Sequence, residues 1–334
     1  MDAKTQTLFR KKLLEWFSRN ARVLPWREKP SLYKTVVSEF MLQQTQVKTV
    51  LPYFNRWLEH FPDFETLAKA DIRKVIKLWE GLGYYSRAKN LQLFAQKFIN
   101  NPAKNFLDLL KFKGVGAYTA AAISSIAFHE KVAVVDGNVI RVLARIFNLQ
   151  NIFPSKDNAV KYVTPLANEL MDAQHPGDFN EAMMELGALV CTKNNPKCQD
   201  CPLKDLCEAF QQGTVDKCPQ FIQLDRKKCL KKRLWLVKDG CLLLEPSRIG
   251  GSHMLWELPE LTPEREACLT SNKLMFVGKR SIGTTTFTEE IYEVSVPNTE
   301  QTQLKRCTYF SLKDVHKISL SGPHKRWIQA LLKE

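Results

Sequence analysis

The sequence predicts an α-helical N-terminal region followed by a smaller C-terminal α+β domain, and three observations support this. The 334 residues exceed what one hydrophobic core usually holds together. From residue 5 to about 210, apolar residues recur at spacings of three and four, the period of amphipathic helices. Beyond about residue 230 the apolar residues form short runs bounded by polar turns, which is typical of strands.

The helical region is expected over residues 1–215, with glycine and proline at the breaks between helices. The helices named by the pattern are Tyr33 to Val47, Asn105 to Lys111, Ala117 to Ala127, Val139 to Phe147 and Asn180 to Val190. A polar stretch with Gly and Pro follows, and then the basic run Arg226 to Arg233, so we expect a linker over residues 216–230.

The C-terminal domain is expected over residues 231–334. Its predicted strands are Leu234 to Leu244, Leu274 to Val277, Phe287 to Val296 and Thr308 to Leu312, and its last segment, Pro323 to Leu332, is a predicted helix. Aromatic residues of this domain, Trp235, Trp256 and Trp327, are expected in its core.

Charge points to a polyanionic partner. Lys and Arg number 49 against 35 Asp and Glu, and the net charge of +14 would attract nucleic acid or an anionic membrane surface. No stretch approaches about 18 uninterrupted apolar residues, and the first residues lack the apolar segment of a signal peptide. We therefore expect a cytoplasmic protein without a membrane partner.

Four cysteines crowd into seventeen positions with the spacing C-x6-C-x2-C-x5-C, at Cys191, Cys198, Cys201 and Cys207. Such crowding suits metal ligation better than disulfides. Tetrahedral zinc and an iron-sulfur cluster both remain open, as do free buried thiols, although one C-x2-C pair flanked by longer gaps favours iron-sulfur. The other cysteines, Cys218, Cys229, Cys241, Cys268 and Cys307, are expected to be small core residues.

A tight turn at Gly114-Val115-Gly116 joins the two predicted helices at Asn105 and Ala117. Without side chains, the two glycines let the backbone approach a phosphate, and the N–H groups that open the second helix can bind that anion. An ordinary helix turn with a glycine C-cap is the alternative. In a chain of charge +14 we favour contact with a DNA backbone.

Two carboxylates stand out beside apolar runs. Asp136 ends the run from Val132 and starts the next helix, where most aspartates are N-caps. Glu39 adjoins the apolar stripe of the helix from Tyr33, and a helical wheel puts Gln44 inside that stripe. Glu39 alone is compatible with a solvated helix-edge charge.

Six motifs together resemble the MutY-type adenine DNA glycosylases of the helix-hairpin-helix superfamily. They are Leu24-Pro-Trp-Arg27, the segment from Ser38 to Gln46, Gly81-Leu-Gly-Tyr-Tyr85, Gly114-Val-Gly-Ala-Tyr118, Val135-Asp-Gly-Asn138 and the four cysteines. The resemblance spans about residues 8 to 210. It implies base excision repair: hydrolysis of the N-glycosidic bond of adenine mispaired with 8-oxoguanine or guanine.

The resemblance also implies a role for each site residue. Glu39 is then the general acid and Asp136 stabilises the oxocarbenium-like sugar, with Tyr118 and Asn138 near the reaction centre. Adenine is flipped into a pocket formed by Trp26, Arg27, Leu42 and Glu181, although core packing explains Trp26 and Leu42 equally well. The implied DNA contacts are Gln43, Gln44, Tyr84, Gly114, Val115, Gly116, Phe287 and Thr288, with Gln44 and Tyr84 as the intercalating residues.

Tyr118 stands where bifunctional relatives that resemble endonuclease III carry a Schiff-base lysine, so a monofunctional enzyme is expected. The four cysteines are then ligands of one [4Fe-4S] cluster. Lys193, Lys197 and Lys204 lie among them and either meet phosphates or are solvated. The expected partner is duplex DNA with an A:8-oxoguanine or A:G mispair, bound by a monomer in a bacterial, nucleoid-associated setting.

In the family the C-terminal domain is Nudix-like and reads 8-oxoguanine. The segment Met254 to Pro259 resembles the family's Gly-Leu-Trp-Glu-Phe-Pro, with Met254 in place of glycine. The family's Phe-Ser-His turn corresponds to Phe287-Thr288-Glu289, where Glu289 would bring a negative charge toward phosphate. No Glu-rich metal helix follows, so nucleotide hydrolysis is not expected.

Two other classes of protein share part of this pattern. A binding module that recognises mismatches without catalysis needs the basic charge and the hairpin but not both carboxylates. An electron-transfer protein needs the cluster but not the other motifs.

Overall fold

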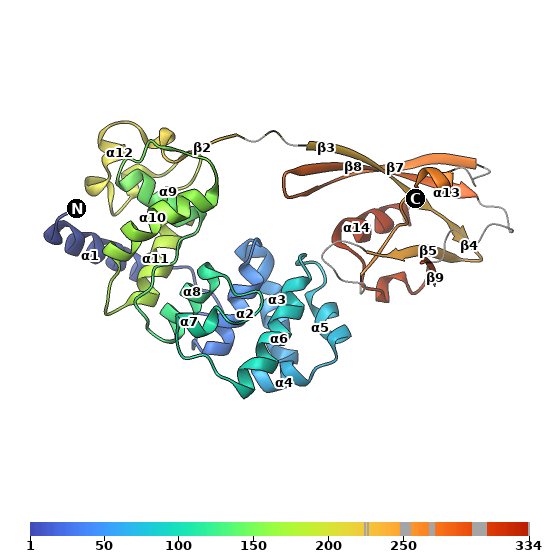
Figure 1. Cartoon of the computed structure of the whole chain (residues 1–334), viewed down its shortest axis with the longest axis horizontal. Coiled ribbons are helices and arrows are strands. Elements are labelled where there is room, and N and C mark those ends of the chain that lie inside the picture. The colour runs from blue at the N-terminus through green and yellow to red at the C-terminus, as the bar shows by residue number, and fades with distance from the viewer. Residues whose placement is uncertain (224, 226, 248–254, 267–270, 296–305, 333–334) are drawn as a thin grey trace. The chain divides into compact units, whose positions relative to one another are not determined.

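The computed structural model describes every residue except 224, 226, 248–254, 267–270, 296–305 and 333–334. Contacts divide the chain into two compact units (Figure 1). The first comprises Met1–Lys69 with Leu93–Gln223, and the second comprises Ala70–Gln92 with Leu224–Glu334. Among the described residues, no helix is both long and apolar enough to cross a membrane.

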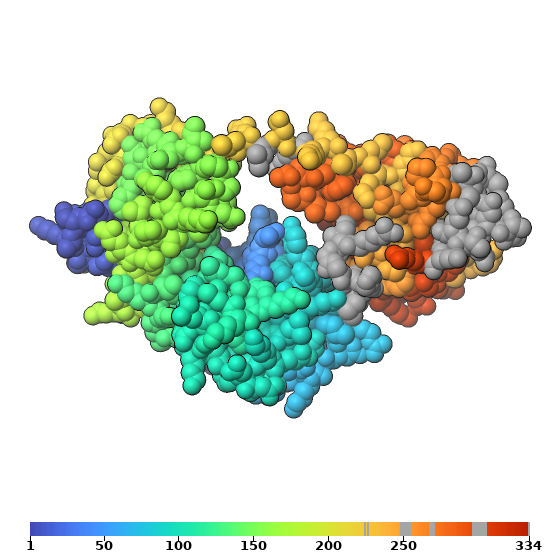
Figure 2. Space-filling model, in the orientation of Figure 1, coloured from blue at the N-terminus to red at the C-terminus, as the bar shows by residue number. Residues whose placement is uncertain are grey.

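The first unit is helical, as the sequence predicts. Its helices are α1 (Ala3–Asn20), α2 (Leu32–Leu42), α3 (Val47–His60), α4 (Phe64–Lys69), α7 (Phe106–Leu109), α8 (Ala117–Ala127), α9 (Gly137–Ile146), α10 (Lys156–Leu170), α11 (Pro176–Leu189) and α12 (Glu208–Gln211), while α6 (Ser86–Asn100) belongs partly to each unit. Two short parallel strands, β1 (Ile152–Phe153) and β2 (Gln220–Phe221), pair within it. Figure 2 shows the start of α1, in dark blue, protruding from this unit.

Side-chain caps fix where several of these helices begin. Asp2, Ser31, Asn105, Asp136 and Ser155 each accept a hydrogen bond from a backbone N–H in the first turn of the helix that follows. These N–H groups have no partner inside the helix, so a polar residue at the N-cap stabilises the start by about 1 kcal/mol.

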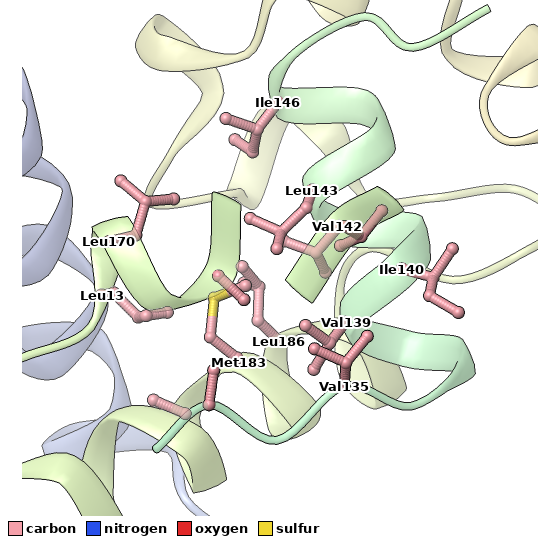
Figure 3. Packing of buried hydrophobic residues seen from close by; sticks show 14 of the residues in the cluster. Leu13, Val135, Val139, Ile140, Val142, Leu143, Ile146, Leu170, Met183 and Leu186 are labelled. Carbon is pink, nitrogen blue, oxygen red and sulfur yellow. The ribbon is translucent and has the colours of Figure 1, made fainter. Parts of the chain in front are cut away.

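The apolar core around α9 carries the functional side of this unit. Val139, Leu143 and Ile146 of α9 are buried against Leu186 of α11 and Leu13 of α1 (Figure 3). Since α9 follows directly on Asp136 and α11 leads directly into Cys191, this core holds both segments in place.

One helix boundary differs from the prediction. The helix expected from Tyr33 to Val47 ends at Leu42, and Gln44 takes a left-handed backbone with φ of 58° before α3 begins. Gln44 is exposed and does not lie in an apolar stripe. The helical wheel was wrong here because it assumed one uninterrupted helix.

Among its described residues, the second unit contains two sheets and three α-helices that lie wholly within it. One sheet has the order β3-β8-β7, from β3 (Lys227–Trp235), β8 (Thr285–Ser295) and β7 (Ser271–Ile282), with β3 parallel to β8. The other consists of β4 (Val237–Lys238), β5 (Cys241–Pro246), β6 (Trp256–Glu257) and β9 (Thr308–Ser311). The helices are α5 (Ile72–Trp79), α13 (Pro263–Glu266) and α14 (Gly322–Leu331). Trp235 and Trp327 are buried and Trp256 packs against the same core.

Two expectations about this unit were wrong. The single strand expected from Leu234 to Leu244 is a hairpin, because Asp239 and Gly240 both adopt left-handed conformations and reverse the chain. Of the basic run expected in a linker, Lys227 to Arg233 lies in β3, an edge strand, where exposed lysines are well tolerated. Arg226 lies outside the described residues. Cys229, on this strand, is exposed and not a core residue, and Cys268 lies outside the described residues.

Candidate active site

Glu39 is a buried acid near the end of α2. Glu39 is only 5% exposed, so the interpretation of Glu39 as a solvated helix-edge charge was wrong. One carboxyl oxygen, Oε2, has no hydrogen-bond partner among the described residues. An unpartnered buried oxygen is costly to leave unsatisfied, and at a cavity wall it is free to engage a ligand.

The surroundings of Glu39 favour its protonated form. Burial raises the pKa of Glu39 to about 8, and the nearby negative charges of Glu181 and Asp136 act in the same direction. A hydrogen bond with Tyr118 and the charge of Arg27 oppose the rise but do not reverse it. Glu39 therefore carries a transferable proton at neutral pH.

Asp136 occupies a different environment at the start of α9. Its Oδ1 accepts hydrogen bonds from the backbone N–H groups of Asn138 and Val139, both at 2.8 Å, and its Oδ2 accepts one at 2.9 Å from the Asn138 side chain. These three hydrogen bonds fix the position of the carboxyl group at the N-terminus of α9. Asp136 is thus the N-cap that the sequence suggested and also the second carboxylate near Glu39.

The hydroxyl of Tyr118 lies beside this pair, 3.4 Å from Sδ of Met184. Burial and the charge of Glu39 hold the pKa of Tyr118 well above its ordinary value, so the hydroxyl stays neutral and can donate a hydrogen bond. Asn138 is held in turn by Arg141, whose Nη2 donates to its Oδ1 at 2.9 Å.

A cavity of about 540 Å³ opens beside Glu39, and Trp26, Arg27 and Glu181 line it. Arg27 Nε donates to Glu181 Oε1 at 2.8 Å. Burial raises the pKa of Glu181, and Arg27 opposes this. The volume falls in the roughly 300–1,000 Å³ range of small-molecule sites. Leu42, expected at the same place, is not among the lining residues.

A second ion pair supports this wall and was not predicted. Glu185, 1% exposed, accepts from the backbone N–H of Arg22 at 2.9 Å and from its guanidinium at 2.7 Å. Its oxygens also lie 3.5 Å from the Arg27 guanidinium. The spacing of Glu181 and Glu185, four residues apart on α11, was a signal that both face the same side of the helix.

The glycine turn presents an open helix start. Gly114 has a left-handed φ of 86°, and its carbonyl accepts a hydrogen bond from the Gln43 side chain at 3.2 Å. Gly116 is the N-cap of α8, and a Cβ placed there would meet no atom within 4 Å. Packing within the protein does not require a glycine at position 116. The missing side chain therefore leaves room for a phosphate. Val115 between them is buried.

Two residues expected to enter the base stack share an unusual backbone. Gln44 and Tyr84 are both left-handed, with φ of 58° and 45°, and Tyr84 is 55% exposed. Such conformations cost roughly 1–3 kcal/mol in non-glycine residues and cluster at functional sites.

The four cysteines line one small cavity between α9 and α11, with Val142, Ile146, Leu186 and Val190 as apolar neighbours. Arg145 donates to Cys191 Sγ at 3.3 Å and to the Thr192 carbonyl at 2.7 Å. In the part of the chain that the structure describes, no group of three or more Cys, His, Asp or Glu converges on the position of a single metal ion. Four thiols on one apolar cavity with a cationic donor fit a sulfur-ligated cluster.

The sequence did not predict a role for Arg141 or Arg145. Arg141 Nε donates to the Cys191 carbonyl at 2.6 Å, and both arginines therefore join α9 to the cysteine loop. Their spacing of four residues on one helix was the available signal.

In the second unit, the residues that correspond to the Phe-Ser-His turn lie within β8 and not in a turn. Phe287 and Thr288 are half-buried, whereas Glu289 is fully buried. Glu289 pairs with Arg233 Nε at 2.6 Å and also with Arg280. The expectation that Glu289 directs a negative charge at phosphate was therefore wrong.

The helical unit combines a buried acid at a cavity wall, an aspartate at a helix N-terminus and an open glycine hairpin, an arrangement typical of base excision repair proteins of the helix-hairpin-helix class. Residues 37–168 match the family described as HhH-GPD superfamily base excision DNA repair protein. A thermostable thymine-DNA glycosylase structure is 28% identical, with a TM-score of 0.57, over 63% of this chain and 98% of that one. An endonuclease III structure solved with DNA shares the fold, at 21% identity and a TM-score of 0.53, over 64% of this chain and 99% of that one.

Curated relatives narrow the family. The adenine DNA glycosylase of Buchnera aphidicola subsp. Baizongia pistaciae is 38% identical over 250 residues, 72% of this chain and 68% of that protein. The rat adenine DNA glycosylase is 43% identical over 236 residues, 65% of this chain but only 45% of its own length. The match to the mammalian relatives thus spans less than half of their length. The chain belongs to the adenine DNA glycosylase family.

Proposed function

We propose that this chain is a monofunctional DNA glycosylase that hydrolyses the N-glycosidic bond of adenine mispaired with 8-oxoguanine or guanine. The observation that carries the proposal is the contrast between two neighbouring carboxyl groups. Glu39 is buried with a pKa raised to about 8, while Asp136 accepts three hydrogen bonds at a helix start. A buried carboxyl group that keeps its proton can act as an acid, and a carboxyl group held by three hydrogen-bond donors can stabilise a developing positive charge.

In the proposed reaction, Glu39 gives its proton to N7 of the extruded adenine, and the bond between C1′ and N9 breaks. The electron pair leaves with the base, which departs neutral. Asp136 stabilises the positive charge that develops on the sugar, and water adds its hydroxyl to C1′ while its proton passes to a carboxylate. Tyr118 and Asn138 hold Glu39 and Asp136 in place.

Base extrusion precedes this chemistry, since C1′ of a stacked nucleotide is not accessible. Gln44 and Tyr84, with their left-handed backbones, would enter the stack, and Gly114 to Gly116 with Gln43 would hold phosphates. Trp26, Arg27 and Glu181 would bind the base in the cavity that they line.

We further propose that Cys191, Cys198, Cys201 and Cys207 hold one [4Fe-4S] cluster. When bound, the cluster would cross-link the loop after α11 and present Lys193, Lys197 and Lys204 to DNA phosphates. Residues 231–334 would form a Nudix-like domain that reads the base opposite adenine through Phe287 and Thr288. The protein would act as a monomer in the bacterial cytoplasm, associated with the nucleoid.

A single-turnover assay tests the proposal. Duplexes with adenine opposite 8-oxoguanine, guanine or thymine are followed for free adenine and for alkali-labile sites, with Glu39→Gln and Asp136→Asn in parallel. We expect release from the first two duplexes, loss of about 10²–10⁴-fold in each variant, and no borohydride-trapped adduct because Tyr118 cannot form a Schiff base. The proposal fails if the unaltered protein releases no adenine.

A further inference from the structure

The cavity beside Glu39 extends from this buried acid to exposed residues, and it leads away from the hairpin. At its inner end, Glu39, Ser38 and Trp26 are buried. At its outer end, Val23, Gln174 and His175 are exposed, and Val23 is 81% exposed. The cavity therefore connects the acid to solvent.

The direction of this opening follows from the chain direction of three helices that lie together in the first unit (Figure 1). The C-terminal end of α2 meets the hairpin, because Gln43 bonds to Gly114 and Thr119. The residues of α2 that line the cavity, Thr35, Ser38 and Glu39, run from there toward its N-terminal end.

Helix α8 gives the same direction. It begins at the hairpin glycine Gly116, and its lining residue is Ile126 in its last turn. Eleven residues at about 1.5 Å each separate the two ends by roughly 16 Å. A Cβ on Gly177 would lie 3.0 Å from Cα of Ile126, so the first turn of α11 packs directly on the last turn of α8.

None of the expected DNA contacts in this unit lines the cavity. Gln43, Gln44 and the segment from Gly114 to Gly116 are absent from its walls, whereas His129, His175 and Asp178 belong to them. The outer walls thus carry polar groups able to exchange hydrogen bonds with the donors and acceptors on the edge of a purine.

From this geometry we propose that the cavity is a separate exit for the neutral adenine base, on the side opposite the DNA-binding hairpin. The inference rests on the proposed function. After cleavage, the sugar of the product still fills the entrance by which the base arrived, so a base confined to that entrance must wait until the DNA dissociates. An exit between the end of α8 and the start of α11 lets adenine leave while the DNA remains bound.

Bulky residues at the mouth test the proposal. In the double variant Val23→Trp/Gln174→Trp, large side chains narrow the opening from two segments of its rim. The matched control is Asn20→Trp/Ala173→Trp, because both positions are exposed and neither lines the cavity. Single turnovers use a duplex with radiolabelled adenine opposite guanine; alkali-labile sites report bond cleavage, and rapid filtration reports adenine retained on the protein–DNA complex.

We expect the mouth variant to produce alkali-labile sites yet retain adenine about tenfold longer or more than the control does. Equal retention in the two variants overturns the exit. Absence of alkali-labile sites with the unaltered protein contradicts the proposed glycosylase function instead, so the two failures are distinguishable.

A second measurement does not depend on turnover. The protein is saturated with a duplex that carries a stable tetrahydrofuran abasic site opposite guanine, and uptake of 2-aminopurine is followed by its fluorescence. Uptake by the unaltered complex, slowed about tenfold in the mouth variant only, supports the exit. Equal uptake by both variants, or no uptake by the unaltered complex, overturns it.

Discussion

Glu39 can act as an acid only while it keeps its proton, and its burial extends the pH range in which it does so. Because the pKa of Glu39 is raised to about 8, we expect the single-turnover rate of adenine release to be retained at pH 7 and to fall as the pH rises through about 8. Rates measured from pH 6 to 10 under saturating protein check this. A rate that instead declines from pH 5 upward would place the acid elsewhere.

The same burial makes Glu39 unfavourable for stability. Above pH 4.5, the ordinary pKa of a glutamate side chain, the unfolded chain loses the proton while the folded protein keeps it, so Glu39 lowers the free energy of unfolding as the pH rises toward 8. We expect Glu39→Gln to be about 1–3 kcal/mol more stable than the unaltered protein at pH 7, with a smaller difference at pH 4.5.

Urea unfolding at the two pH values measures this difference, and the exposed Glu59→Gln serves as control. An inactive variant that is more stable separates catalysis from folding at this residue. A Gln variant that is equally or less stable at pH 7 would contradict the burial argument.

At the scale of elements, two glycines near the site should respond oppositely to alanine. Gly116→Ala meets no protein atom at the start of α8, so we expect little change in the urea midpoint but weaker DNA binding, because the methyl group occupies the space of the phosphate. In Gly187→Ala on α11, the new Cβ would lie 2.6 Å from Cβ of Asn138, and we expect a loss of roughly 1–3 kcal/mol of stability.

Fluorescence anisotropy with an A:G duplex and urea unfolding distinguish the two variants. If Gly116→Ala binds DNA normally, phosphate does not sit at this helix start. If Gly187→Ala is as stable as the parent, α9 and α11 are less rigidly packed than the core in Figure 3 implies.

At the scale of the whole molecule, the cysteine loop should matter more for DNA binding than for folding. The core around α9 is built from Leu143, Leu186 and their apolar neighbours, and the cysteines only border it. We expect a cluster-free Cys198→Ser variant to keep its helical circular dichroism and to lose DNA affinity. Anisotropy at several salt concentrations measures this, and intact affinity in such a folded variant would contradict the prediction.

Much of this architecture could be predicted from the sequence, because apolar period and glycine turns are local signals. The hairpin at Gly114 and the N-cap at Asp136 were of this kind, and helix α8 occupies the expected residues. The left-handed backbone at Gln44 could not be predicted in this way, because no glycine or proline marks that position. The Asp239-Gly240 turn did carry a local signal, which the predicted strand ignored.

Features that depend on distant segments were beyond the sequence. Glu39 shares a cavity wall with the segment around Trp26 and with helix α11, and a helical wheel of α2 alone contains neither. Glu289 pairs with Arg233, 56 residues away, so a resemblance in sequence could not show that its charge is neutralised inside the unit.

Helix α8 has one end at the hairpin and the other at the cavity rim. The two ends lie roughly 16 Å apart along the helix, so substitutions can change them separately. Selection for faster turnover would therefore act on the rim without weakening DNA binding. A small molecule bound at the rim would likewise inhibit adenine release without competing with DNA. Its potency would not fall as the DNA concentration is raised.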